Sequence, residues 1–469
     1  MNWLLLKNSI LVCGGATLLA VALGFAAVFF IAGVSRGRRA LLGAVLVALV
    51  LPPFLVTNAW LDLLGQSGAI RRWLPLNIYS LGGASALLAL LHWPITTLLV
   101  LGAWNRLEAA QLEMDPALRG GALVRWVLWP MARVAAGQAA LLTFVLALNN
   151  FAVPVILQVP VFPEELWLAF TSRLNHAGAW SAAAPMVLAP LLALLLLRRG
   201  EIMWPRTQGT VSAELVRRQL GSPWFGACAA ISVILIGLAL GAPLAQLAAS
   251  GRTWAELPNL LRAAPGVIWN SFAFAAAAAT VCVAGGLATW RLPLGVPAWV
   301  AFFIPGVLLG QAAIAVFSRT VIYGTAALVV GMFALRYFAI GWSGVALARR
   351  SVDRDLTDAA RMSGARGWTL FRLVHWPQIA PQAAAAWYVI YLLCLWDVET
   401  LVLIYPPGGE TLALRIFNFL HYGHTAQVNA LCVTLLALAI APLAAWQMVR
   451  WITAHFSLSP QRGEGRGEG

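Results

Sequence analysis

The chain has 469 residues, of which 61% are hydrophobic and only 10% are charged, and its mean hydropathy is +0.82. A soluble protein of this size could not bury so much apolar surface, so part of its solvent must be lipid. The net charge of +14 comes almost entirely from arginines in short loops between apolar runs, where they set membrane orientation. Composition therefore excludes an ordinary soluble protein, and the basic charge does not indicate nucleic-acid binding.

Apolar runs long enough to cross a hydrocarbon core as helices recur along the chain. They lack the alternating polarity of membrane strands. Prolines interrupt several runs, including Pro52-Pro53 and Pro305, and neighbouring helices can accommodate such kinks. We predict an all-α polytopic membrane protein with eleven spans, at 9–32, 40–60, 79–103, 133–154, 177–197, 224–246, 268–290, 295–316, 322–342, 379–402 and 427–448.

The basic residues of the loops predict the orientation of these spans. With the N-terminus outside, 22 arginines fall on the inner side and eight basic residues on the outer side, while Arg336 lies within a span. Cytoplasmic loops carry the excess of Lys and Arg. We therefore predict a membrane protein whose N-terminus faces outward and whose C-terminus is cytoplasmic.

Two polar loops between predicted spans repeat one sequence pattern 247 residues apart, at 111–130 and 358–377. Aligned without a gap, they agree at seven of 20 positions, where unrelated sequences would agree at roughly one or two. Both fall on the predicted cytoplasmic side, which indicates two copies of one docking surface. The matching pairs are Arg119/Arg366, Gly120/Gly367, Leu123/Leu370, Arg125/Arg372, Val127/Val374, Trp129/Trp376 and Pro130/Pro377.

The repetition extends beyond the loops. Asn8-Ser9 and Asn270-Ser271 open corresponding spans. Glu165, His176 and Gly178 recur as Glu410, His421 and Gly423. We predict two homologous halves with the same orientation, a parallel repeat. The predicted divisions are a first half at 1–200 with five spans, a cytoplasmic linker at 201–222, a second half at 223–456 with six spans, of which the one near 224–246 restores the orientation, and a disordered tail at 457–469.

The second loop carries a recognisable motif. It has the order Asp358-Ala359-Ala360, three residues, Gly364, nine residues, Val374, one residue and Trp376-Pro377. This resembles the EAA loop, EAA-x3-G-x9-I-x-LP, of permease subunits in binding-protein-dependent ABC importers. The residues that the resemblance implies for ATPase coupling are Asp358, Ala359, Ala360, Gly364, Arg366, Gly367, Val374 and Pro377 in the second loop and Glu108, Ala109, Ala110, Arg119, Gly120 and Pro130 in the first.

The resemblance covers about residues 5–450 and implies a fold like that of type I ABC importer permeases. The fused two-half organisation and the stretch 410–416 are similar to the iron(III), thiamine and phosphonate branch. The resemblance also implies a place in the bacterial inner membrane, with the N-terminus in the periplasm. Such a permease moves solute by alternating access, with a periplasmic solute-binding protein and separate ATPase subunits as partners.

The spacing of the second loop also makes physical sense. Asp353 or Asp355 can cap a short helix, and Gly364 can end it in a left-handed turn. We expect a second short helix to run from there to Pro377, where the next span begins. The first copy is degenerate, because Gln111 and Ala117 stand in place of the acid and the glycine, and Glu108-Ala109-Ala110 lies one helical turn upstream. An amphipathic loop lying on the lipid surface is the alternative reading of either copy.

Lys7 is the only lysine of the chain. A phosphate-binding loop of the GxxxxGK[ST] type needs a lysine, and Lys7 is predicted to lie on the outer side. We therefore expect no cofactor on this chain and no enzymatic activity of its own. ATP hydrolysis is expected on two separate ATPase subunits, one for each loop.

Polar residues within the predicted spans are the candidate translocation pathway. Asn149 and Asn150 lie near the outer end of the fourth span, and Asp397 and Glu399 lie in the corresponding part of the tenth. Charge at membrane depth usually faces a cavity or a partner, so these residues either line a polar vestibule for solute or bond between helices. Arg336 needs an acidic or carbonyl partner and can have a structural role or recognise an anion.

Two other classes of protein remain alternatives. An ion-coupled secondary transporter can also be built from repeats, and only Asp397 and Glu399 would serve as coupling acids. A membrane enzyme acting on lipid would need a cluster of His, Asp, Glu or Cys on one face, which the sequence lacks. His421 and His424 alone do not predict a metal site.

Overall fold

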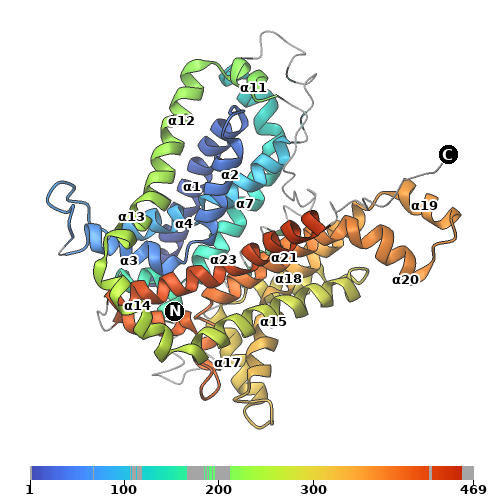
Figure 1. Cartoon of the computed structure of the whole chain (residues 1–469). Coiled ribbons are helices and arrows are strands. Elements are labelled where there is room, and N and C mark those ends of the chain that lie inside the picture. Colours follow the sequence, from blue (N-terminus) through green and yellow to red (C-terminus); the bar gives the residue numbers. More distant parts are fainter. Residues whose placement is uncertain are drawn as a thin grey trace, which may run out of the picture.

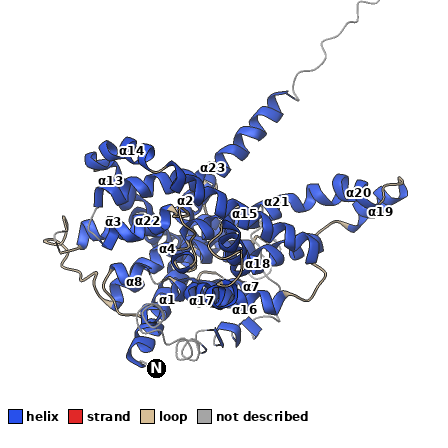
Figure 2. Cartoon of the chain, turned by 90° about the horizontal axis from the view of Figure 1, so that it is seen from below, coloured by secondary structure: helices blue, strands red, loops and turns tan. Residues whose placement is uncertain are grey.

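The computed structural model describes residues 3–66, 68–105, 119–150, 152–165, 212–421 and 425–456, with isolated positions between 107 and 195. Helices make up the ordered elements of these ranges (Figure 2). The first part of the chain forms α1 (Trp3–Ala32), α2 (Arg38–Val50), α3 (Pro53–Leu64), α4 (Leu81–Trp104), α6 (Gly121–Leu123), the π-helical η1 (Val124–Leu128), α7 (Trp129–Asn149) and α8 (Ala152–Ile156).

The remaining elements follow residue 212. A connecting group comprises α11 (Ala213–Leu220), α12 (Ser222–Ile236), η2 (Gly237–Gly241), α13 (Ala242–Ala249) and α14 (Gly251–Ala263). The last part forms α15 (Pro265–Thr289), α16 (Gly295–Phe303), α17 (Gly306–Phe317), α18 (Ala326–Arg350), α19 (Arg354–Met362), α20 (Gly367–Leu370), the π-helical η3 (Phe371–His375), α21 (Trp376–Trp396), η4 (Leu401–Leu403), α22 (Leu412–His421) and α23 (Thr425–Phe456).

Membrane-spanning helices dominate this fold. Eight helical segments of the described residues are long and apolar enough to cross a membrane, and two bent helix pairs raise the number to as many as ten. The prediction of an all-helical polytopic membrane protein is therefore confirmed. The predicted span at 177–197 falls largely outside the described residues.

Two predicted spans, 40–60 and 295–316, are bent sharply near the prolines that interrupt them. Each is a bent pair: α2 and α3 meet at 90°, and α16 and α17 meet at 103°. At both bends a proline follows a residue in extended conformation, Leu51 before Pro52 and Ile304 before Pro305. Proline disfavours the helical conformation of the residue that precedes it, so the helix stops there and restarts in a new direction.

The same hydrogen bonds recur at corresponding positions of the two parts. The Ser9 hydroxyl accepts from the Phe162 amide at 2.8 Å, and the Ser271 hydroxyl accepts from the Leu412 amide at 2.8 Å. The neighbouring Asn8 and Asn270 side chains each donate to a carbonyl in the same returning segments. A membrane interior cannot satisfy such amides with water, so these side chains fix where each returning segment docks.

The two parts also pack their first long helices in the same way. Gly24 of α1 lies against Trp93 and Thr96 of α4, and Gly286 of α15 lies against Gly341 of α18. Small residues let helix backbones approach closely in a membrane. Gly341 of α18 lies 245 positions after Thr96 of α4, and other residues of the two helices correspond at the same offset. Equivalent residues of the two parts therefore make the close helix contact.

The two parts cross each other. Figure 1 shows α1, α7 and α12 running in one direction, with α15, α18, α21 and α23 lying across them. Helix α3 contacts α13 and α23, and α14 packs along α23, so the connecting group and α23 join the two parts. Helices α19 and α20 extend away from the rest of the molecule in both views (Figures 1 and 2).

Candidate coupling loop and intramembrane polar cluster

The motif of the second loop begins with a capped helix. Asp353 precedes α19, and its carboxylate accepts from the amides of Asp355 at 2.9 Å and Leu356 at 3.5 Å. The Thr357 hydroxyl donates back to the Asp353 carbonyl. Of the two acids that the sequence offered as a cap, Asp353 performs that role, and Asp355 lies in the first turn, where a negative charge is favourable.

Gly364 makes the turn that ends α19, as predicted. Its φ angle is +86°, its amide donates to the Arg361 carbonyl, and the Ala365 amide donates to the Ala360 carbonyl. A side chain at this position would meet open space, so the requirement for glycine comes from backbone conformation. A second left-handed glycine, Gly367 with φ +54°, starts the next helix.

The predicted second short helix is not a separate element. Residues Gly367 to Trp396 form one continuous helical segment of 30 residues, in which α20 and η3 lead directly into α21. Pro377 lies in the first turn of α21, where its missing amide is tolerated because η3 accommodates the altered bonding. The second loop is therefore a short helix, a glycine turn and the protruding start of a membrane span.

The surface of this loop is exposed and partly apolar. Asp358 and Ala359 are exposed, and Val374 is half-buried. Asp358 forms a 3.3 Å ion pair with Arg361, which contributes little because both side chains lie in water. Met362 and Trp368 are 85% and 71% exposed, on the part of the molecule that extends furthest from the bundle (Figure 1). Large apolar side chains gathered on a protrusion mark an interaction surface.

The first loop shares the backbone of the second where it can be compared. Gly120 has φ +56°, and the π-helical turn η1 lies 247 residues before η3. Pro130 occupies the first turn of α7, as Pro377 does in α21, and Arg119 is exposed. The predicted coupling residues Glu108, Ala109 and Ala110 lie outside the described residues.

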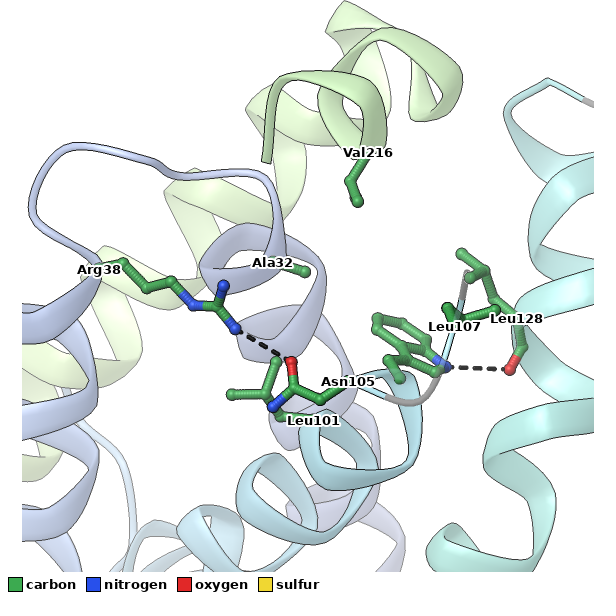
Figure 3. Close-up of a pocket in the computed structure, with 8 residues that line it drawn as sticks. Ala32, Arg38, Leu101, Asn105, Leu107, Leu128 and Val216 are labelled. Carbon is green, nitrogen blue, oxygen red and sulfur yellow. Dashed lines mark hydrogen bonds between the residues drawn. The ribbon is translucent and has the colours of Figure 1, made fainter. Parts of the chain in front are cut away.

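The first loop differs in being partly covered. The Gly120 amide donates to the carbonyl of Gln219 in α11 at 2.9 Å. Beside it lies a cavity of about 30 Å³, which Val216 of α11 closes on one side (Figure 3). Arg38 lines this cavity and donates to Asn105 at 3.1 Å. The volume is enough for about one water molecule, so the cavity is no solute site.

Arg336 has the acidic partners that a buried guanidinium requires. Its Nη1 donates to Asp397 Oδ2 at 2.8 Å and to Thr400 Oγ1 at 2.7 Å, and its Nη2 donates to Glu399 Oε2 at 3.0 Å. The Tyr337 hydroxyl adds a 2.8 Å bond to Asp397. All these residues are buried. The predicted pathway residues Arg336, Asp397 and Glu399 therefore form one polar cluster between α18 and the segment after α21.

This cluster lies directly under the bend of α16 and α17. A Cβ atom on Gly306 would collide with Arg336 Nη1 and would lie 2.7 Å from Glu399 Cβ. Gly310, one turn later, lies 3.2 Å from the Thr400 carbonyl by the same measure. Glycine at these positions lets α17 rest on the charged cluster, which therefore supports the bend between α16 and α17.

Asn150 and Asp397, which the sequence aligned, make the same local bond. Asn150 Oδ1 accepts from the Val153 amide at 3.1 Å, and Asp397 Oδ1 accepts from the Thr400 amide at 2.9 Å. Each caps the short helix that follows its span. Asn149 is buried, and among the described residues its Oδ1 has no hydrogen-bond partner. These contacts are structural, and contact with solute stays a prediction for all five residues.

Sequence reasoning missed the polar contacts of α3. Asn58 donates to Asn429 of α23 at 2.6 Å, and both side chains are buried. One turn later, Asp62 accepts from Gln246 of α13. Asn58 and Asn429 are 371 positions apart, and no repeat pattern links them. Within the described residues, no three of His, Cys, Asp and Glu lie close enough to hold a metal ion.

No family model matches the chain. The chain is similar to the spermidine/putrescine transport system permease protein PotC of Escherichia coli (strain K12), with 30% identity over 100 residues, 21% of this chain and 38% of that protein. It is also similar to the putative 2-aminoethylphosphonate transport system permease protein PhnV of Salmonella paratyphi A (strain ATCC 9150 / SARB42), with 28% identity over 139 residues, 29% of this chain and 52% of that protein.

A third relative is the putrescine transport system permease protein PotI of Escherichia coli (strain K12), 29% identical over 101 residues, 21% of this chain and 36% of that protein. The chain thus spans about half, or less, of the length of each curated relative that it matches. All three are named as permease proteins of transport systems. Together with the membrane-spanning helices, this similarity supports a transport permease.

Replacing Arg336 with methionine should destabilise the protein strongly. Two buried carboxylates would lose their counter-ion, at a cost of about 3–5 kcal/mol. Thermal unfolding in detergent measures this as a lower Tm. The matched control is Arg415→Gln, which breaks the half-exposed pair with Glu410 and should cost less than about 1 kcal/mol. Combining Arg336→Met with Asp397→Asn and Glu399→Gln should restore most of the loss. An equal lowering of the Tm in Arg336→Met and Arg415→Gln would contradict the stabilising role of the polar cluster.

Proposed function

We propose that this chain is the membrane permease of an ABC importer, moving a small polar solute from periplasm to cytoplasm by alternating access. Separate ATPase subunits supply the energy, and a periplasmic binding protein delivers the solute. The observation that carries the proposal is the projecting helix α19 with its Gly364 turn, which bears the EAA-type sequence and exposes apolar side chains. Similarity to three named permease proteins supports the same reading.

The shape of the loop suits mechanical coupling. Helix α19 is short and capped at Asp353, so it can enter a groove on a partner as a rigid body. The glycine turn joins it to a helix that continues into the bundle without a break. Movement of an ATPase subunit would therefore displace α21 directly, with no flexible linker to absorb it.

The two docking loops are unequal in this proposal. In the second, Asp358, Ala359 and the apolar side chains around them are open to a partner. In the first, α11 is hydrogen-bonded to Gly120 and covers one side. We propose that two ATPase subunits bind, and that the first contacts α11 as well as the degenerate loop.

Ion-coupled transport receives less support from these contacts. Asp397 and Glu399 were the acids available for coupling, and both carboxylates are bound to Arg336. A coupling acid has to exchange protons or ions during the cycle, whereas each of these carboxylates already has a guanidinium partner.

A Gly364→Asp substitution should abolish ATPase binding while leaving the permease in the membrane. Aspartate tolerates a φ of +86° less well than glycine and adds a charge at the docking turn. Copurification of ATPase subunits with the tagged permease measures the effect. The control is Gly324→Asp, since Gly324 has φ +73°, equally open surroundings and a place before the opposite end of α18. Unchanged ATPase recovery with Gly364→Asp would refute the docking role.

Cysteine labelling should place α19 on the cytoplasmic side. The five native cysteines are buried, so a cysteine at exposed Ser363 or Ser318 can be labelled selectively. In intact spheroplasts an impermeant maleimide should label Ser318→Cys and should label Ser363→Cys only after permeabilisation. The reverse pattern would put the loop out of reach of ATP-driven subunits and end the proposal.

The solute is proposed to carry a primary ammonium group. Spermidine, putrescine and 2-aminoethylphosphonate, named in the three relatives, share this group. Phosphonate is also one of the solute classes that the sequence resemblance implied, beside iron(III) and thiamine. Uptake of its solute by the complete transporter should be inhibited by an excess of putrescine or 2-aminoethylphosphonate. Inhibition by thiamine or iron(III) alone would contradict this solute class.

A further inference from the structure

A group of cationic and aromatic side chains gathers where α15, α18 and η3 end on one side of the molecule. We call Trp290, Arg291, Arg349, Phe371 and His375 the arginine cluster. The Arg349 guanidinium lies over Phe371 at 4.9 Å and over Trp290 at 5.5 Å. Arg291 lies over the same Trp290 ring at 5.0 Å. Two guanidinium groups thus share one indole and are held close together.

The cluster has cations without matching anions. Among the described residues, no Asp or Glu side chain lies within ion-pairing distance of Arg291 or Arg349. Arg349 Nη1 donates to His375 Nδ1 at 3.3 Å, and its Nε is buried without a hydrogen-bond partner. Of the acids at α19, Asp353 caps the helix and Asp358 pairs with Arg361. Like charges held together with unused donors attract an external anion.

The surroundings of the cluster match a lipid headgroup region. The three helices that carry it belong to candidate membrane spans, and the cluster lies near one end of each span. Exposed apolar side chains flank it, including Leu292 in the turn after α15, Leu373 of η3 and Trp376 at the start of α21. Tryptophan and arginine are enriched at the level where hydrocarbon meets headgroups. The cluster therefore lies where a phospholipid phosphate would be within reach, nearer the bundle than the projecting α19.

The first half does not repeat this arrangement. Arg38 occupies the position of Arg291, counted from the matching bends at Pro52 and Pro305. Trp104 of α4 stands where α18 has Arg349, and Leu128 of η1 stands where η3 has His375. The Trp104 indole donates to the Leu128 carbonyl. Arg38 is bound by Asn105 instead (Figure 3). Packing of the repeat thus does not require paired arginines.

We infer that the arginine cluster binds the phosphodiester of an anionic phospholipid at the membrane face from which α19 projects. The guanidinium groups donate to phosphate oxygens, while the acyl chains lie along the apolar sides of α15 and α21. Basic pockets between membrane helices hold anionic headgroups in this way. The inference needs only the contacts above and is independent of the proposed transport function.

Native mass spectrometry of the full-length permease, titrated with phosphatidylglycerol or phosphatidylcholine, tests the site. Phosphatidylglycerol adducts should weaken by about fivefold for each arginine removed in Arg291→Gln and Arg349→Gln, while phosphatidylcholine adducts stay unchanged. Arg291 is exposed, so its single variant keeps the fold even if Arg349→Gln does not. The matched control is Arg350→Gln with Arg354→Gln, neighbouring arginines that stack on no ring of the described residues.

Three results would overturn the inference. Equal weakening in the control variant would show a diffuse charge effect instead of a site. Unchanged phosphatidylglycerol binding in Arg291→Gln and in the double variant would exclude the cluster. Displacement of phosphatidylglycerol by excess inorganic phosphate, with phosphate itself bound, would assign the cluster to a free anion.

Discussion

Hydrocarbon offers no hydrogen bonds, and this constraint decides where the backbone of the chain can leave the helical conformation. At four departures a side chain supplies the missing partner. Ser9 and Ser271 accept from the amides that open the returning segments, and Asn150 and Asp397 accept from the amides that follow α7 and α21. The non-helical turns recur at equivalent positions of both parts because the same small polar residues recur there.

Hydropathy alone could predict that the chain crosses the membrane repeatedly as helices, but not how straight each crossing is. Pro94 and Pro442 lie inside α4 and α23, which continue through them, whereas Pro52 and Pro305 each end one helix and begin another. The difference lies in the residue before the proline, which is extended only at the bends. An average over twenty residues contains no information about that single dihedral angle.

The candidate coupling loop was predictable because its determinants are local. An acid before a helix, a glycine after it and a proline at the next helix start act within a few residues of one another, and Asp353 and Gly364 have the predicted roles. The polar cluster was predictable only in part. A buried arginine requires acids, but the three-dimensional fold brings Asp397 and Glu399 to Arg336 across more than 60 positions, and the Asn58–Asn429 contact left no trace in the sequence.

The unbroken helix from Gly367 to Trp396 has a further consequence. Thirty helical residues form a rod of about 45 Å, the depth of a whole bilayer with its headgroups. One end of this segment carries the exposed Trp368. The residue after its other end is Asp397, which forms an ion pair with Arg336 beneath the α16–α17 bend. A displacement of the water-facing end would therefore be carried along this one helical segment, past η3 and Pro381, to the ion pairs of Arg336 near its other end.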